Sequence, residues 1–475
     1  MSSIKKSRSN RGKRILHLDG FSFHLNSTSS KGTKYWRCIK YPMCGGTAVE
    51  KPGRRPACGR IPHNHAANPE RVDTMMAVAQ LKQRAKTDAS AQPKALYRDS
   101  LCQAVENQSA ASFPPFESLS STLYRLRRES FPSCAGLAND LRVEDQFTRT
   151  RTGERFLLID SRYRGRDGNT KRMLVFSSDR QLEMLSNART IAFDGTFNMC
   201  PSQFTQIFVI HGNAEDTFHP LVFALLENKD CVTYRTLISG LQNACGERNL
   251  TLNPTQILSD FEASAQNVFA QHFPNSRMTG CNFHHSQALW RFIQSKGLQS
   301  DYVKQKNLQL RKLFRTVAAL PFLPAEGIAR NFHGIIRKYR MDGIGDLPAG
   351  RVKEVLDGLD KYYKRQWIPK TLMLSVFLSE HRTNNIAEAF NSKMTRLLES
   401  HKPGLYKLID FLKKEEAEVQ GRMAQLTHGD GVIRRNAKSV LKDAKVADLN
   451  RKLASGDIGE TEFLERVASQ ITSLG

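Results

Sequence analysis

The pattern of apolar and polar positions predicts a sheet with helices between about residues 136 and 285. Seven short runs have the length and composition of strands, and two longer segments have apolar residues at helical spacing. The predicted strands are Arg155–Asp160, Met173–Ser177, Thr190–Phe197, Phe204–His211, His219–Leu226, Gln256–Ser259 and Met278–Phe283. The predicted helices are Cys231–Arg248 and a segment from Phe261 to His272. Strands that first follow one another and then alternate with helices are typical of an α/β mixed sheet covered by helices.

The segments on either side of this region are predicted to be helical. Residues 285–380 carry four helical patterns, which lie at Ser286–Ser295, Tyr302–Ala318, Ala325–Tyr339 and Val352–Trp367. Residues 396–475 are predicted as a charged helical tail. Residues 68–135 are predicted as a helical linker, with helices at Val72–Ala85 and Lys94–Asn107 and a loop at Ser118–Ser121.

The first 67 residues lack long helical patterns. Residues 1–14 are polar and basic, and they are predicted to be a disordered arm that serves as a nuclear-import signal or contacts phosphate. Residues 15–67 carry short aromatic runs, Ile15–Leu25 and Thr33–Ile39, that predict a small β-rich domain. A domain of this size needs a staple such as a metal ion.

The distribution of charged residues indicates what kind of partner the chain binds. The 475 residues include 71 Lys and Arg against 46 Asp and Glu, a net charge of +25. Residues 1–60 hold 14 of the basic residues and only Asp19 and Glu50, so about half of the excess lies in about an eighth of the chain. A charge that only kept the protein soluble would be spread out, whereas a concentrated one favours nucleic acid as the partner.

Other compositional features exclude several classes of protein. No run of about 18 apolar residues is present, so we expect no transmembrane helix and no membrane partner. No apolar stretch follows the first charged residues, so a secretory signal peptide is not expected. Nine cysteines are too few for a disulfide framework and indicate reduced, intracellular thiols.

Cysteine and histidine cluster in the small N-terminal domain. Cys38 and Cys44 are followed by His63 and His65, and two Cys with two His can supply a tetrahedral zinc site. The alternative is that Cys38 is a buried thiol and the histidines belong to a polar loop. Cys58 is a competing ligand.

The flanking residues strengthen the zinc interpretation. The string LDGFSFHL…YWRC…C…HNH, over residues 15–67, resembles the FLYWCH-type zinc finger. The resemblance implies a zinc-bound β-sheet that binds DNA, with Cys38, Cys44, His63 and His65 as ligands. The interleaved basic residues would then contact DNA phosphates, which gives affinity without sequence specificity. These residues are Arg37, Lys40, Arg54, Arg55 and Arg60.

Two acidic residues lie at the ends of predicted strands. Asp194 lies in the apolar run Thr190–Phe197, and Asp260 directly follows Gln256–Ser259. The alternatives are that Asp194 begins a turn and that Asp260 caps the next helix. Carboxylates on neighbouring strand ends can instead share divalent metal ions, which would clamp the attacking and leaving oxygens of a phosphodiester.

A third acid is needed to complete such a site. Glu388 lies on a predicted helix, off the apolar stripe formed by Ile386, Phe390, Met394 and Leu397. Asn384, which could cap this helix, and Asn391 and Ser392 share the face of Glu388. Glu262 is a rival for the third position, although it would also favour a helix N-terminus electrostatically.

These acids lie within strings that together resemble the Mutator-like element (MULE) transposase domain. The strings are IAFDGTF at 191–197, ILSDFE at 257–262, GCNFHHSQALW at 280–290 and RTNNIAEAF at 382–390, with Gln206–His211 and His219–Glu227 between the first two. The resemblance covers about residues 136–395. It implies a ribonuclease-H-like fold in which Asp194, Asp260 and Glu388 form a DDE triad that holds Mg²⁺ or Mn²⁺. Residues 285–380 would then be an all-α insertion.

Cys281 and His284 form a C-x-x-H motif after the second acid. The MULE resemblance implies that such a motif lies near the active site, where it could position DNA. The alternative is a buried cysteine beside a structural histidine.

Three functions remain to be distinguished. The first is a transposase that cuts element ends and joins them to target DNA, in the nucleus and as a homodimer or higher oligomer. The second is a host-domesticated DNA-binding regulator without catalysis. The third is a protein-binding scaffold, which the basic N-terminal domain argues against. Because all three acids are present, the sequence favours the enzyme over the regulator.

Overall fold

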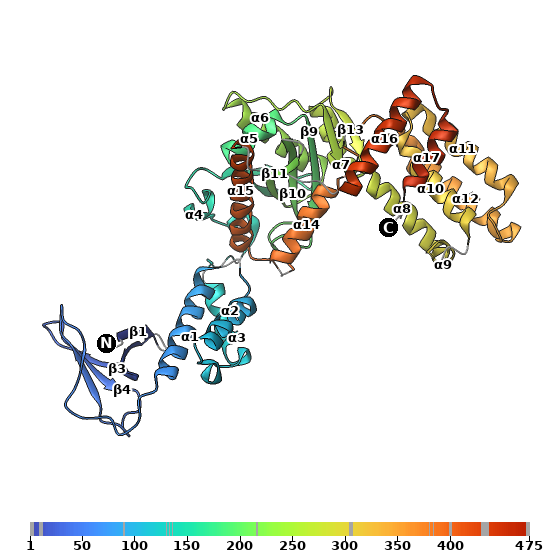
Figure 1. The fold of residues 1–475 in the computed structure, drawn as a ribbon. Coiled ribbons are helices and arrows are strands. Elements are labelled where there is room, and N and C mark those ends of the chain that lie inside the picture. The colour runs from blue at the N-terminus through green and yellow to red at the C-terminus, as the bar shows by residue number, and fades with distance from the viewer. Residues whose placement is uncertain are drawn as a thin grey trace. The chain divides into compact units, whose positions relative to one another are not determined.

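The protein is described by a computed structural model that covers residues 4–8, 13–88, 91–129, 131–132, 134, 136–214, 217–303, 307–379, 381–382, 384–398, 401–428 and 437–471. The chain divides into two compact units, Met1–Ser133 and Cys134–Gly475 (Figure 1). The division lies two residues from the start of the predicted catalytic domain at 136.

The first unit begins with a six-stranded antiparallel sheet in the order β1-β2-β3-β4-β5-β6. Its strands are β1 (Ile4–Arg8), β2 (Arg14–Leu18), β3 (Phe21–Thr28), β4 (Lys34–Cys38), β5 (Thr47–Glu50) and β6 (Ala57–Cys58). The apolar run Ile15–Leu25 forms two of them, because Asp19 and Gly20 have φ angles of 52° and 81° and close a tight hairpin. Leu16, Phe23 and Trp36 form the core of the sheet together with Cys38 and Cys44.

One expectation for this unit is wrong at its N-terminus. Residues 1–14 were expected to be a disordered arm, yet Ile4–Arg8 pairs with β2, with Lys6 opposite Leu16. The pairing uses backbone groups, which do not depend on the polar side chains of this segment. The remaining predicted arm residues 1–3 and 9–12 lie outside the described residues.

Three helices complete the first unit. They are α1 (Pro69–Thr87), α2 (Pro93–Glu106) and α3 (Phe116–Glu129), with the short 3₁₀ turn η1 (Ala110–Ser112) before α3. The predicted loop at Ser118–Ser121 is wrong, because these serines lie within α3, whose buried Leu119 and Leu123 pack in a small core with Leu81 and Leu96. Tertiary packing outweighs the weak helix propensity of serine here.

The second unit is built on a seven-stranded sheet in the order β13-β12-β9-β10-β11-β8-β7. Its strands are β7 (Leu157–Arg164), β8 (Thr170–Phe176), β9 (Thr190–Thr196), β10 (Gln206–Ala214), β11 (Thr217–Leu226), β12 (Gln256–Ser259) and β13 (Arg277–Gly280). Strands β9, β12 and β13 are parallel to one another, whereas β10, β11, β8 and β7 continue the sheet by antiparallel pairing. The predicted mixed α/β sheet is therefore confirmed.

Helices cover this sheet. A core cluster joins Phe193 and Phe208 to Tyr234 and Phe269, which lie on α6 and α7. Helix α14 packs through Ile386 against Ala192 and its neighbours on the side of β9 opposite Phe193. Figure 1 shows α15 lying along the sheet with α14 beside it. The helices associated with the sheet are η2 (Ala138–Asp140), α4 (Asp145–Thr148), α5 (Asp179–Asn187), α6 (Cys231–Gly246), α7 (Ala263–His272), α14 (Asn385–Leu398) and α15 (Leu405–Thr427).

The remaining helices share a separate apolar core. They are α8 (Asn282–Ser295), α9 (Gln299–Val303), α10 (Leu308–Ala319), η3 (Leu320–Phe322), α11 (Ala325–Asp342), α12 (Ala349–Gln366), η4 (Ile368–Lys370), α13 (Thr371–Leu374), α16 (Ala437–Ser455) and α17 (Glu460–Gln470). Phe314, Phe332 and Tyr363 lie at the centre of this core.

The predicted tail, residues 396–475, does not form a separate element in this unit. Helix α15 packs on the sheet, where Val419 joins its core, whereas Val446 and Phe463 of α16 and α17 join the helical core. Each of these helices has an apolar face that must be buried against another element. Within the described residues, no helix is both long enough and apolar enough to span a bilayer.

Candidate functional site

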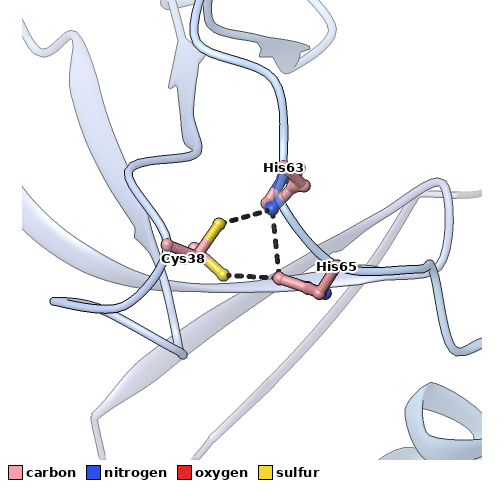
Figure 2. Close-up of side chains that lie close together, drawn as sticks. Cys38, His63 and His65 are labelled. Carbon is pink, nitrogen blue, oxygen red and sulfur yellow. Dashed lines mark hydrogen bonds between the residues drawn. The ribbon is translucent and has the colours of Figure 1, made fainter.

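The four predicted zinc ligands converge in the first unit. Cys38 ends β4, Cys44 follows it in a turn, and His63 and His65 come from the segment after β6. Their ligand atoms all lie within 4.8 Å of one another. Figure 2 shows His63 and His65 pointing toward Cys38. Within the described residues, this is the one group of three or more Cys, His, Asp or Glu side chains gathered so closely.

The spacing of the four atoms fits a zinc ion. Sγ of Cys38 lies 3.3 Å from Nε2 of His65, and Sγ of Cys44 lies 3.3 Å from Nδ1 of His63. The two histidine nitrogens are also 3.3 Å apart. Bond lengths of about 2.0–2.3 Å in a tetrahedron place ligand atoms about 3.3–3.8 Å from one another. The donor set and its spacing therefore indicate a structural zinc site.

Neighbouring groups hold the ligands in these positions. The ring of His63 stacks on Phe21, with centroids 3.8 Å apart and planes at 6°. Nδ1 of His65 lies 3.0 Å from the carbonyl oxygen of Ala66, which leaves Nε2 free for the metal. Gly46 is needed for close packing, since a Cβ there would lie 2.5 Å from Cε1 of His63.

The competing ligand and the basic residues lie outside this cluster. Cys58 is exposed on β6 and is not one of the four clustered residues. Lys40, Arg54, Arg55 and Arg60 are exposed, as phosphate-contacting residues must be. The guanidinium group of Arg37 lies 4.1 Å from the centre of the Tyr41 ring, so this side chain is partly held in place.

In the second unit, Asp194 and Asp260 meet at the ends of neighbouring strands. Strands β9 and β12 are parallel, and Phe193 lies opposite Ser259 in their register. The residue that follows each of them is therefore carried to the same edge of the sheet. Asp260 does not begin helix α7, whose N-cap is Glu262, so the alternative that Asp260 caps the next helix is wrong.

The Asp194 carboxylate is partly buried and held by two donors. The backbone N–H of Gly195 donates to Oδ1 over 2.8 Å, and the Asn391 side chain donates to Oδ2 over 2.6 Å. Burial, together with the negative charge of Asp260, raises the pKa of Asp194 to about 7. Two acids this close disfavour each other's ionisation, and a cation between them would relieve that cost.

His284 lies between the second and third predicted acids. Its Nδ1 is 3.0 Å from Oδ1 of Asp260, and its Nε2 is 3.5 Å from Oε1 of Glu388. Burial by itself would lower the pKa of His284, but the interactions with Asp260 and Cys281 together outweigh burial and raise it to about 10. Both ring nitrogens face acidic side chains, and the raised pKa favours the protonated ring, which would link Asp260 to Glu388.

Helix α14 carries Glu388 to this site and is fastened to β9. The side chain of Asn384 donates to the carbonyl oxygen of Phe193 over 3.0 Å, and its backbone N–H donates to Sγ of Cys281 over 3.2 Å. Asn384 therefore ties the helix to the sheet through its side-chain N–H₂ group. The predicted apolar stripe is wrong at one position, since Leu397 is 46% exposed and the neighbouring Leu398 is buried. Burial raises the pKa of Glu388, and the adjacent imidazolium opposes that rise.

The rival acid Glu262 is directed elsewhere. The hydroxyl of Tyr234 donates to Oε1 of Glu262 over 2.8 Å, and Gln206 donates in turn to that hydroxyl over 2.9 Å. Oε1 of Glu262 is therefore already engaged in a hydrogen bond with Tyr234. The structure thus brings Asp194, Asp260, Glu388 and His284 together and leaves Glu262 outside that group.

Sequence reasoning did not find two of these relationships. The hydrogen bond from Asn391 to Asp194 joins residues 197 positions apart. The one available signal was that Asn391 lies three residues after Glu388 on a helix and so shares its face. His284 was noticed as part of a C-x-x-H motif, but nothing in that motif indicates that it joins two acids.

Comparison with known protein families agrees with the division of the chain into two units. Residues 6–65 match the family model of the FLYWCH zinc finger domain, and residues 190–288 match that of the MULE transposase domain. The chain carries both domains. The MULE match includes Asp194, Asp260 and His284 and ends before Glu388. It supports a transposase-like function.

Comparisons with whole proteins add little. One chain of the Drosophila P element transposase strand transfer complex aligns with a TM-score of 0.28 and 12% identity, over 74% of this chain and 92% of that one. No match was found among curated proteins.

Proposed function

We propose that this protein is a DDE-type transposase that binds DNA through its FLYWCH finger and cuts and joins DNA at the MULE domain. The observation that carries the proposal is the meeting of Asp194 and Asp260 on adjacent parallel strand ends, with Glu388 joined to Asp260 through His284. The strand order supports a ribonuclease-H-like fold for this domain. Strands β9, β10 and β11 are consecutive and antiparallel, and the parallel strands β12 and β13 extend the sheet beyond β9.

The acidic side chains fit a hard divalent cation. Asp194, Asp260 and Glu388 offer only carboxylate oxygens, the ligands that Mg²⁺ and Mn²⁺ prefer. When bound, such a cation would supply activation of water or a 3′-hydroxyl and stabilisation of charge on the phosphodiester. The chain's own groups prepare the site, because Asn391 and Gly195 orient the Asp194 carboxylate and hydrogen-bond its ionised form.

The finger supplies DNA affinity in this proposal. Zinc held by the Cys38 cluster fixes the segment that follows β6 against β4, beside exposed Lys40 and Arg60. Phosphate contacts from such residues give binding that falls with salt concentration. We also infer a nuclear location and at least a dimer on DNA, because joining two element ends needs two copies of the active site.

The test compares cleavage and strand transfer on DNA that carries the terminal repeats of the element. We expect the wild type to act only with Mg²⁺ or Mn²⁺, and Asp194→Asn to lose more than about 100-fold in rate. Asp346→Asn is the matched control, since Asp346 is exposed and remote in sequence from the three acids. Equal, metal-independent behaviour of wild type and Asp194→Asn would overturn the proposal.

A second function is favoured by the His284 contacts. A protonated His284 between Asp260 and Glu388 would neutralise acids that a metal would otherwise share. This arrangement suits a regulator that keeps the fold and binds DNA without catalysis. The same experiment separates the two functions, because a regulator would bind the repeats with undiminished affinity and show no cleavage at any Mg²⁺ or Mn²⁺ concentration.

A further inference from the structure

A cleft of about 700 Å³ opens inside the first unit, between the finger sheet and helices α1 and α3. Six basic side chains line it: Lys6, Arg14, Lys34, Lys82, Lys86 and Arg125. Three come from strands and three from helices, so the positive charge is shared by two walls that are distant in sequence. Lys6 and Arg14 belong to the segment 1–14, for which phosphate contact is one of the two predicted roles, whereas the other four residues were not predicted to contact phosphate.

The acidic residue that lines this cleft is already neutralised. Glu50 lies 2.6 Å from Nζ of Lys6 and 3.8 Å from Nζ of Lys34. These two lysines come from β1 and β4, so the sheet curves enough to bring both to the same carboxylate. Arg125 also pairs with Glu129, which does not line the cleft, over 2.6 Å. The lining itself still carries six basic side chains against one acidic side chain, and this excess of positive charge favours a polyanion.

The floor of the cleft is apolar. Ile15 and Trp36 are buried at its base, and Met76 and Leu126 line its helical side. A cleft with cationic walls and an apolar floor matches the sugar–phosphate backbone of DNA, which presents charged phosphates beside apolar sugar faces. A small inorganic anion would leave the apolar floor unused.

The helices are fixed against the sheet, so the two walls keep their spacing. Lys5 on β1 forms an ion pair of 2.6 Å with Asp73 on α1. The backbone N–H of Asn68, which caps α1, donates to the carbonyl oxygen of Gly20 in the first hairpin over 2.9 Å. Helix α1 in turn packs on α3 through the core around Leu81 and Leu123.

We propose that this cleft binds the DNA backbone, so that helices α1 and α3 are part of the DNA-binding unit and not only a linker. The inference rests on the proposed DNA-binding function and extends it to a second surface. Lys82 and Lys86 lie one helical turn apart on the same face of α1, which suits contacts to successive phosphates.

The experiment measures DNA affinity of the full-length protein as a function of salt concentration. The cleft variant is Lys86→Gln with Arg125→Gln, both exposed residues of the helical wall. We expect its affinity to fall roughly tenfold and its salt dependence to decrease by about two released counterions. The control is Lys94→Gln with Arg98→Gln, which removes the same charge from α2 outside the cleft and should bind like the wild type.

Other outcomes contradict the inference in different ways. If the cleft variant matches the wild type in affinity and salt dependence, the cleft does not bind DNA, although the finger does. If the DNA affinity of the control variant falls as much as that of the cleft variant, total charge accounts for DNA binding. The cleft is then not a specific DNA-binding surface. If the wild type does not bind DNA, the proposed function fails as well. Unchanged zinc content and helical circular dichroism show that each variant is folded.

Discussion

Asn391 donates a hydrogen bond of 2.6 Å to Oδ2 of Asp194, across 197 residues of sequence. The bond joins helix α14, which also carries Glu388, to the strand that carries the first acid. An amide N–H stabilises the ionised carboxylate, which burial and Asp260 disfavour. Asn391 therefore supports the charge state that metal binding requires.

Removal of this donor should change the pH dependence of the proposed activity. In Asn391→Ala, the pKa of Asp194 should rise further above about 7, so the rising limb of the pH–rate profile moves to higher pH. At pH 7 we expect a loss of roughly tenfold that is largely regained near pH 9. A profile that keeps its midpoint and falls uniformly would contradict this role. Asn187→Ala, a change on α5, is the control.

The protonation of Asp194 should also appear in stability. The folded protein binds this proton more tightly than the unfolded chain, because the pKa is about 7 against an ordinary 3.8. The stabilising contribution is complete below about pH 4 and is lost as the pH rises through about 7. Without divalent cations, Asp194→Asn should exceed the wild type in unfolding free energy at pH 8 by on the order of 2 kcal/mol and match it at pH 4. Urea denaturation measures this difference, and Asp346→Asn should show none.

Loss of His284 should be destabilising, and the His284 contribution, like that of Asp194, is lost as the pH rises. Its pKa is raised to about 10 from an ordinary 6.5, so its contribution is complete below about pH 6.5 and is lost as the pH rises through about 10. His284→Ala should therefore lower the unfolding free energy at pH 6 by on the order of 2 kcal/mol, and the deficit should shrink by pH 10. His333→Ala, at an exposed position on α11, is the control. A deficit that is constant with pH would indicate lost packing alone.

The zinc site can be tested through a residue that is not a ligand. In Gly46→Ala, the new Cβ would overlap the ring of His63, so this ligand must move. We expect zinc affinity to fall by roughly 10–100-fold, in a competition titration with a chelator. Cys38→Ser should lose the ion, as elemental analysis would show, whereas Cys58→Ser should retain it because Cys58 is exposed and outside the cluster. Retention of full zinc by Cys38→Ser would contradict the ligand set.

The local pattern of apolar residues predicted a strand or helix correctly where one face of that element packs against a core. The apolar runs at 190–197 and 219–226 predict β9 and β11 because a buried strand needs such residues. The prediction failed at α3, where serines stand in a helix, and at β1, where polar residues pair by backbone alone. In both places, partners from elsewhere in the chain determine the structure, and a local pattern does not contain them.

The sequence by itself identified the four clustered Cys and His residues and the two acids carried by strands. Cys38, Cys44, His63 and His65 lie within 28 positions of one another, and a metal demands those residue types at such spacing. Asp194 lies near the end of one apolar strand and Asp260 directly follows another, and neighbouring parallel strands carry such residues to one edge. Both sets could be named without coordinates because short-range chemistry and strand geometry constrain them.

Only the tertiary structure decided how distant side chains contact the two strand-borne acids. Glu388, Asn391 and His284 reach the acids through helices whose packing depends on cores formed over hundreds of residues. The direction in which a helix presents a polar side chain depends on the element against which the apolar face of that helix packs. The local sequence does not identify that element. The basic cleft of the first unit has the same origin, since α1 and α3 form its wall only after they pack on each other and α1 packs on the sheet.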